Sequence, residues 1–233
     1  YDSAKSIDLV IPLSFEEMRD AMAETIRRND MRNGYIRLIV SRGVGNLGLD
    51  PRRCPKPTVL IIVEQLAIYS EEAYLNGLRA VSVSQRRNLP DALNPKIKSL
   101  NYLNNILVKI QSNFAEADEA IMLNAQGYVT EGSGDNIFLV KNGVVYTPPC
   151  YLGALEGITR NAIIKLCEIL GYKLKEEPFS MHDVYIADVV FFTGTAAEVI
   201  AAREIDGRVI GQGQAGPVTL KLLEEFRKIV TQD

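Results

Sequence analysis

The segment Glu131-Gly132-Ser133-Gly134-Asp135-Asn136 has residue types that suit a ligand-binding site. Its two carboxylates are four residues apart, and the glycines beside them allow a ligand to come close to the backbone. Paired carboxylates in a pocket are candidates for chemical function. An ordinary polar loop between two strands would have the same composition, so the spacing alone leaves both interpretations open.

Three other features could bind an anion. Thr159 follows Gly157-Ile158 at a predicted helix start, where unpaired backbone amides and the helix dipole favour a phosphate. The run Thr193-Gly194-Thr195-Ala196-Ala197 follows a strand and offers hydroxyls and free amides. For both, a turn or helix start with a satisfied cap is the alternative. Arg37 interrupts an apolar strand, and an arginine in such a place pairs with either a phosphate or a structural carboxylate.

A literal G-x-G-x-x-G occurs at Gly211, Gly213 and Gly216. This motif binds dinucleotides only within a complete strand-turn-helix unit that has an acidic ribose ligand about 20 residues further on. Here Pro217 already begins the last predicted helix, and the sequence ends at Asp233. We therefore interpret these glycines as a surface turn.

Four segments resemble, in order and spacing, the successive motifs of the class IV pyridoxal-phosphate-dependent aminotransferases: residues 95–102 (PKIKSLNY), 131–138 (EGSGDNIF), 154–160 (ALEGITR) and 193–198 (TGTAAE). The resemblance covers essentially the whole chain and is closest to the branched-chain amino acid aminotransferases of bacteria and archaea. It implies a mixed α/β (α+β) protein with the two-domain class IV aminotransferase fold, which is fold type IV of such enzymes. It also implies pyridoxal 5'-phosphate as the cofactor and a homodimer or higher homo-oligomer. The implied reaction moves the amino group of a branched-chain L-amino acid to 2-oxoglutarate.

The resemblance further implies a role for each matching residue. Lys98, rather than the structural Lys96, would hold the cofactor covalently and move the proton between substrate and cofactor. Glu131 would pair with the pyridine nitrogen and keep it protonated. The phosphate would be held by Arg37, Ile158, Thr159 and Thr195, and Gly157 would also bind the cofactor. The ring would pack on Leu155, the phenolic oxygen would lie near Tyr102, and the substrate carboxylate would be received by Thr195 and Ala196.

The sequence also departs from the branched-chain pattern. Lys98-Ser99-Leu100-Asn101 has the spacing of D-amino acid aminotransferases and aminodeoxychorismate lyases, whereas residues 84–95 look like the interdomain loop of branched-chain enzymes. Asp135 stands where many relatives have glutamate, and His182 matches no catalytic position. The opening Tyr1-Asp2-Ser3-Ala4-Lys5 resembles the middle of the family's first domain, so we expect the usual N-terminal segment to be missing from this sequence. A truncated, non-catalytic cofactor-binding remnant is therefore an alternative of another class.

Composition limits the possible partners. A formal net charge of -3 and a pI near 5.4 give no broad positive surface for nucleic acid or an anionic membrane. No apolar run reaches the roughly 20 residues that span a bilayer, and the start has no signal-peptide character, so we expect a cytoplasmic protein that binds small molecules. Cys54, Cys150 and Cys167 are odd in number and far apart, which argues against a disulfide framework or a paired-cysteine zinc site. The single histidine allows no imidazole cluster for a metal.

Hydrophobic periodicity and turn residues predict the elements that position these residues. We expect a small first domain over residues 1–92, with a helix capped at Ser14 and strands at 35–40, 58–63 and 80–84. A large cofactor-binding domain would follow over residues 93–233. Its helices are expected at 100–110, 159–170 and 217–230, with a short one capped at 180–183, and its strands at 120–123, 128–130, 136–140, 144–146, 172–176 and 189–192. The active site is expected between the two domains.

Overall fold

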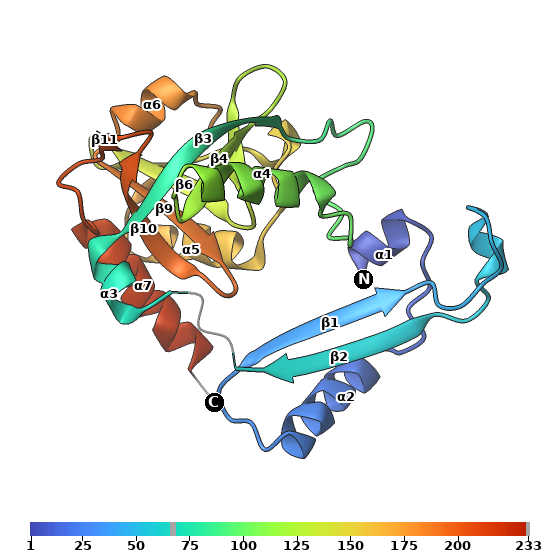
Figure 1. Ribbon diagram of the computed structural model, residues 1–233. Helices are drawn as coiled ribbons and strands as arrows, with labels where there is room; N and C mark the ends of the chain where they lie inside the picture. Colours follow the sequence, from blue (N-terminus) through green and yellow to red (C-terminus); the bar gives the residue numbers. More distant parts are fainter. Residues whose placement is uncertain (66–68, 232–233) are drawn as a thin grey trace. The chain divides into compact units, whose positions relative to one another are not determined.

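Figure 1 shows the computed structural model, which describes residues 1–65 and 69–231. The chain divides into two compact units, Tyr1–Ala67 and Ile68–Asp233. This division lies before the junction near residue 92 that the sequence suggested. The reason is that β3 (Leu78–Arg86) pairs with two strands of the second unit and so forms part of its sheet.

The first unit contains an antiparallel strand pair and short helices within residues 1–65. Its elements are α1 (Asp2–Ser6), α2 (Phe15–Arg28), β1 (Tyr35–Ser41), the 3₁₀ turn η1 (Pro51–Arg53) and β2 (Thr58–Glu64). Helix α2 begins at the predicted capping box, in which the side chains of Ser14 and Glu17 each accept a hydrogen bond from the other's backbone amide. In the strand pair Arg37 lies opposite Ile62, and both residues are exposed.

The second unit is built on one nine-stranded mixed sheet within residues 69–231. The strand order is β5-β4-β3-β10-β9-β6-β7-β8, and β11 pairs with β10. The strands after β3 are β4 (Glu119–Leu123), β5 (Val129–Gly132), β6 (Asn136–Lys141), β7 (Val144–Thr147), β8 (Lys173–Glu176), β9 (Val189–Gly194), β10 (Glu198–Ile205) and β11 (Arg208–Val209). The helices are α3 (Glu71–Asn76), α4 (Leu103–Phe114), the 3₁₀ turn η2 (Cys150–Leu152), α5 (Ile158–Ile169), α6 (Met181–Tyr185) and α7 (Pro217–Val230).

The centre of this sheet forms the core of the second unit. Phe138 on β6 lies opposite Phe191 on β9, and their rings stack with centroids 5.0 Å apart. Helix α5 packs against β9 and helix α7 against β10, and Ile163 and Leu222 of these helices are fully buried. Burying one such side chain contributes about 1.5–3 kcal/mol. The motifs at residues 131–138 and 193–198 include the start of β6 and the end of β9, so well-buried neighbours hold both motifs in place.

Each predicted helix and strand overlaps an observed one. Asn142 and Gly143 both have positive φ, as the predicted hairpin between β6 and β7 requires. Strands β10 and β11 and helices α1 and α3 were not predicted. The segment Gly211 to Gly216 joins the two-residue antiparallel β11 to α7, so it lacks the strand-turn-helix context of a dinucleotide site.

The remaining composition-based expectations concern thiols, histidine and membranes. Cys54, Cys150 and Cys167 are all free, and burial raises the pKa of the Cys167 thiol to about 11. His182 is exposed on α6. No helix in the described part of the chain has the length and apolar character needed to cross a bilayer.

Candidate active site

The turn between β5 and β6 brings three of the four motifs together. Glu131 lies near the end of β5, Asn136 begins β6, and the turn is closed by a hydrogen bond from the Gly132 amide to the Asp135 carbonyl at 2.6 Å. The third motif reaches this turn through Leu155, and the fourth reaches it through Gly194. Segments that are far apart in the sequence thus form one cluster.

Two contacts hold the carboxylate of Glu131. Its Oε1 pairs with Nη2 of Arg87 at 2.6 Å, and its Oε2 accepts a hydrogen bond from the Leu155 amide at 2.8 Å. The side chains of Arg87 and Glu131 are only 9% and 7% exposed. Burial raises the pKa of Glu131, whereas the Arg87 guanidinium and the Leu155 amide act to lower it. The carboxylate is therefore buried, paired and fixed in direction.

The start of α5 has the features of an anion site. Gly157 is its N-cap residue, and no side chain caps the helix, so the first amides are not satisfied by a side-chain acceptor. A Cβ at Gly157 would lie 2.2 Å from Oδ1 of Asn136, so the close approach requires glycine. Asn136 also donates to the Leu155 carbonyl at 2.8 Å. Thr159 is buried in the first turn, while Ile158 is exposed.

The turn between β9 and β10 contains Thr195 and Ala196. Thr195 is exposed and Ala196 is half-buried. The preceding Gly194 lies against Asp135. Burial and the nearby Glu119 carboxylate raise the pKa of Asp135 to about 7. The cluster thus contains a carboxyl group that titrates near neutrality.

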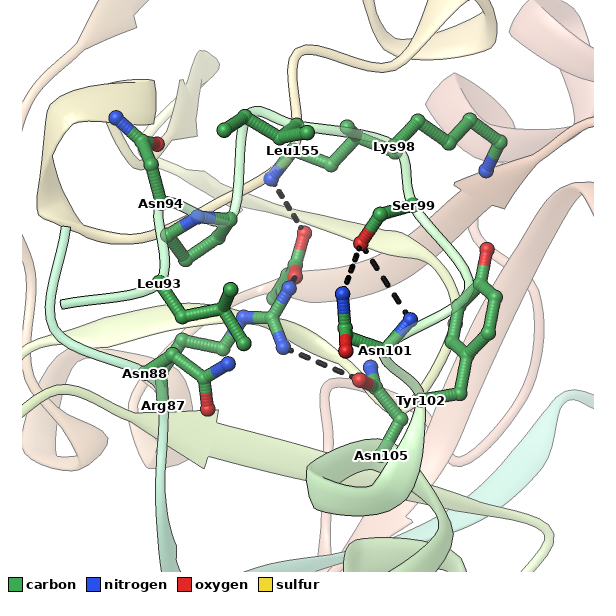
Figure 2. Close-up of a pocket in the computed structure, with 14 residues that line it drawn as sticks. Arg87, Asn88, Leu93, Asn94, Lys98, Ser99, Asn101, Tyr102, Asn105 and Leu155 are labelled. Carbon is green, nitrogen blue, oxygen red and sulfur yellow. Dashed lines mark hydrogen bonds and ion pairs between the residues drawn. The ribbon is translucent and has the colours of Figure 1, made fainter. Parts of the chain in front are cut away.

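Lys98 and Glu131 line the same pocket (Figure 2). Tyr102 and Leu155 also line it, together with residues of the loop before α4. In Figure 2 the Lys98 side chain is extended, with its ammonium group directed away from Leu155. Lys96 instead forms a surface ion pair with Glu156 at 2.9 Å. One pocket is therefore lined by both an exposed lysine and a buried carboxylate.

The family model described as amino-transferase class IV matches residues 1–205. The chain belongs to this family. A "Putative branched-chain-amino-acid aminotransferase" of Methanocaldococcus jannaschii is 54% identical over 232 residues, which are 100% of this chain and 80% of that protein. The branched-chain-amino-acid aminotransferase of Pseudomonas aeruginosa is 40% identical, over 99% of this chain and 75% of its own length.

A solved structure agrees with this assignment. It is the branched-chain amino acid aminotransferase of Escherichia coli. It has a TM-score of 0.95 and 36% sequence identity, and the match covers 98% of this chain and 76% of that chain. The prediction of the class IV aminotransferase family and of its mixed α/β fold is confirmed.

The class IV aminotransferase residues expected from the motifs fall into three groups. Lys98, Tyr102, Glu131 and Leu155 line the pocket. A second group, made up of Gly157, Ile158, Thr159, Thr195 and Ala196, is not among the pocket-lining residues. Of these, Gly157 lies against Asn136, and Thr195 follows Gly194, which lies against Asp135. Arg37 is an exposed residue of β1 in the first unit, and its role at the phosphate stays a prediction.

Sequence reasoning missed two polar residues of this class IV aminotransferase site. Arg87 binds Glu131, and Asn105 accepts a hydrogen bond from Arg87 at 3.3 Å. The sequence did contain one indication that Arg87 belongs to the site, because Arg87 directly follows a strand and lies in a turn-rich segment. Asn105 lies one helical turn after Tyr102, so it could have been placed near the Lys98 motif. The meeting of both residues at Glu131 depends on the pairing of β3, β4 and β5, which local sequence does not reveal.

Proposed function

We propose that this chain transfers the amino group of a branched-chain L-amino acid to 2-oxoglutarate with pyridoxal phosphate as cofactor. The observation that carries the proposal is the pocket shared by Lys98 and Glu131 in a chain of the class IV aminotransferase family. Lysine amines bind carbonyl groups covalently, and a buried carboxylate is the partner that a protonated ring nitrogen needs. The relatives named as branched-chain aminotransferases support the choice of substrate.

The chemistry of the described residues fits pyridoxal phosphate. The α5 start, with no side-chain cap, suits a phosphate group. A carboxylate can accept about four hydrogen bonds, and Arg87 and Leu155 supply two to Glu131, so acceptor capacity remains for a ring nitrogen. When bound, the cofactor supplies an aldehyde that condenses with amines and a protonated ring that withdraws electrons from the substrate Cα.

Each of the expected site residues then has a defined role. Lys98 would bind the cofactor through Nζ and later move the proton at the substrate Cα. Glu131 would accept a hydrogen bond from the ring nitrogen, and Leu155 would cover one ring face. The phosphate would be bound by Arg37, Gly157, Ile158, Thr159 and Thr195, the phenolic oxygen would lie near Tyr102, and the substrate carboxylate would be bound by Thr195 and Ala196.

Initial rates with L-leucine and with D-alanine, each with 2-oxoglutarate, test the reaction and its stereochemistry. We expect L-leucine to be the better donor. Lys98→Ala should lower kcat by at least about a hundredfold, the lower end of the range for a positioned acid–base group. The matched control, Lys96→Ala, removes an exposed lysine two residues away and should leave kcat within about twofold, as surface substitutions usually do.

Two outcomes would favour the alternatives. A higher rate with D-alanine would contradict the branched-chain assignment and favour the D-amino acid aminotransferase or lyase activities that the Lys98-Ser99-Leu100-Asn101 spacing permits. Binding of pyridoxal phosphate without turnover of either donor would favour a non-catalytic remnant.

A homodimer, the oligomer expected from the resemblance, has support in the surface of α4. This helix buries Val108 and Ser112 but leaves a row of large apolar side chains exposed: Leu103, Ile106, Leu107, Ile110 and Phe114. Their helical spacing places them along one face. A row of five exposed apolar side chains is typical of an interaction surface. A second copy of the chain, related by twofold symmetry, can cover this row with its own α4. Sedimentation of wild type and of Ile110→Asp should show a dimer and a monomer, respectively.

A further inference from the structure

The guanidinium group of Arg87 joins several segments around the pocket. Its Nη2 pairs with Glu131 at 2.6 Å, its Nε donates to the Gly153 carbonyl at 3.0 Å, and its Nη1 donates to Oδ1 of Asn105 at 3.3 Å. Asn105 in turn donates to the Ser133 carbonyl at 2.7 Å. Figure 2 shows the bond between Arg87 and Asn105. All three guanidinium nitrogens therefore have a defined partner.

These contacts also hold residues 153–155 in place, the segment that binds Oε2 of Glu131. Gly153, which accepts from Arg87, is two residues before Leu155, whose amide donates to Glu131 at 2.8 Å. Gly153 has a φ of 116°, and a Cβ there would lie 3.3 Å from Cγ of Arg87, so glycine permits both the backbone conformation and the contact. The Arg87 backbone is anchored by its own amide, which donates to the Leu123 carbonyl at 2.9 Å.

Arg87 also supplies a permanent charge. A buried carboxylate with no cation nearby takes up a proton, because burial disfavours its charged form. Arginine does not lose its proton in proteins, so the positive charge beside Glu131 persists across the physiological pH range. Lys98 also acts to lower the pKa of Glu131, whereas Asp135 is a second carboxyl group electrostatically coupled to it.

We propose that Arg87 is a positioning residue that holds Glu131 as an ionised carboxylate in one direction at the pocket. The inference rests on the proposed function, in which Glu131 accepts a hydrogen bond from the cofactor's ring nitrogen. A protonated Glu131 would donate a hydrogen bond instead of accepting one, and would be a poorer partner for a protonated ring. The loss should therefore appear in kcat, and the KM for the amino acid should change little.

Two substitutions separate the charge of Arg87 from its hydrogen bonds. Arg87→Gln removes the charge and keeps a polar side chain for Gly153 and Asn105, whereas Arg87→Lys keeps the charge and loses the planar fork. We expect Arg87→Gln to lower kcat at least about tenfold, with KM for L-leucine within about threefold, as for a group that acts in the chemical step. The acidic limb of its kcat profile should move to higher pH. Arg87→Lys should keep the wild-type acidic limb and recover part of kcat.

Arg86→Gln is the matched control, because Arg86 is the exposed neighbour of Arg87 and contacts the Val83 carbonyl at 3.5 Å. Its kcat and pH profile should equal those of wild type. A readout that does not depend on turnover is infrared difference spectroscopy of each protein against the same protein carrying Glu131→Gln. Wild type, Arg86→Gln and Arg87→Lys should show an ionised Glu131 at neutral pH, and Arg87→Gln should show a protonated one.

The inference is overturned if Arg87→Gln keeps an ionised Glu131 together with the wild-type kcat and pH profile, while Glu131→Gln alone impairs turnover. That result would leave the proposed function intact. If Glu131→Gln is as active as wild type, or wild type neither binds pyridoxal phosphate nor turns over L-leucine, the proposed function is wrong and the role given to Arg87 is wrong with it.

Discussion

Gly194 lies so close to Asp135 that a Cβ at position 194 would be 1.9 Å from Oδ1 of the carboxylate. Gly194 ends β9, and Asp135 directly precedes β6. The two strands pair with Asn136 opposite Thr193, so the contact follows from the register of the sheet. Glycine at position 194 therefore allows the motif at residues 193–198 to contact the motif at residues 131–138.

A methyl group at position 194 should disturb this contact. We expect Gly194→Ala to destabilise the protein by about 1–3 kcal/mol, the usual cost of overpacking, and to weaken pyridoxal phosphate binding because Thr195 would move. Gly134→Ala is the matched control, since a Cβ there meets no atom within 4 Å, and its effect should stay within about 0.5 kcal/mol. Urea unfolding and cofactor titration would measure both. Equal stability of the two variants would contradict the prediction.

The raised pKa of Asp135 makes stability depend on pH. Burial, the neighbouring Glu119 and Glu131 raise this pKa to about 7 from an ordinary value of 3.8, while Lys109 and Lys98 act to lower it. Between these two pH values the unfolded chain releases the Asp135 proton and the folded chain keeps it, so ionisation favours unfolding as pH rises. The asparagine side chain of the Asp135→Asn variant cannot ionise, so the variant should not lose stability in this way as pH rises.

The difference in unfolding free energy between Asp135→Asn and wild type should therefore grow in favour of the variant between about pH 4 and pH 7. Its size should be on the order of 2–4 kcal/mol, at about 1.4 kcal/mol for each pH unit. Urea unfolding of both proteins at several pH values provides the measurement. A difference that stays constant with pH would show that Asp135 is ionised throughout this range.

The local signals in the sequence were sufficient for most elements. The capping box at Ser14 correctly marked the start of α2, Pro217 marked the start of α7, and the positive φ of Gly171 follows the end of α5 as predicted. Each of these features acts within one turn of backbone, so its physical cause is visible in adjacent residues. The motif residues of the site were identified differently, through the resemblance of short segments to those of a known family, and the roles given to them stay predictions.

Features that depend on distant partners were not found. Strand β10 mixes charged and apolar residues without alternation, and it is defined by pairing with β3 on one side and β9 on the other. The row of apolar residues on α4 indicated an amphipathic helix, but much of that row is exposed. The contact between Arg87 and Glu131 likewise requires the order of strands in the sheet. Periodicity does not specify which strands are neighbours.

The stacked rings of Phe138 and Phe191 should be a large source of stability for the strands that carry the site. Both side chains are completely buried, so Phe191→Ala would leave a cavity and should cost about 3–5 kcal/mol. Phe191→Leu fills more of the space and should cost less. Urea unfolding would rank the two variants, and equal costs would contradict a cavity as the cause.

Glu198 combines an unfavourable backbone conformation with a strong ion pair. Its φ is 54°, a left-handed value that glycine adopts more easily than glutamate. Its Oε2 accepts hydrogen bonds from Nε and Nη2 of Arg227 at 2.9 and 2.7 Å. Since Glu198 directly follows the turn that contains Thr195 and Ala196, Arg227 on α7 helps to hold that turn in place.

The order of stability of two substitutions tests this account. Glu198→Ala loses the ion pair and keeps the unfavourable φ, whereas Glu198→Gly loses the ion pair but relieves the backbone, so the glycine variant should be more stable by about 1 kcal/mol. Glu204 provides the control, because it lies on the same strand without a positive φ and pairs with Arg79 at 3.2 Å. There the order should reverse, with alanine more stable than glycine by about 0.5–1 kcal/mol. Thermal or urea unfolding of the four variants gives both differences, and the same order at both positions would mean that backbone strain at Glu198 is not significant.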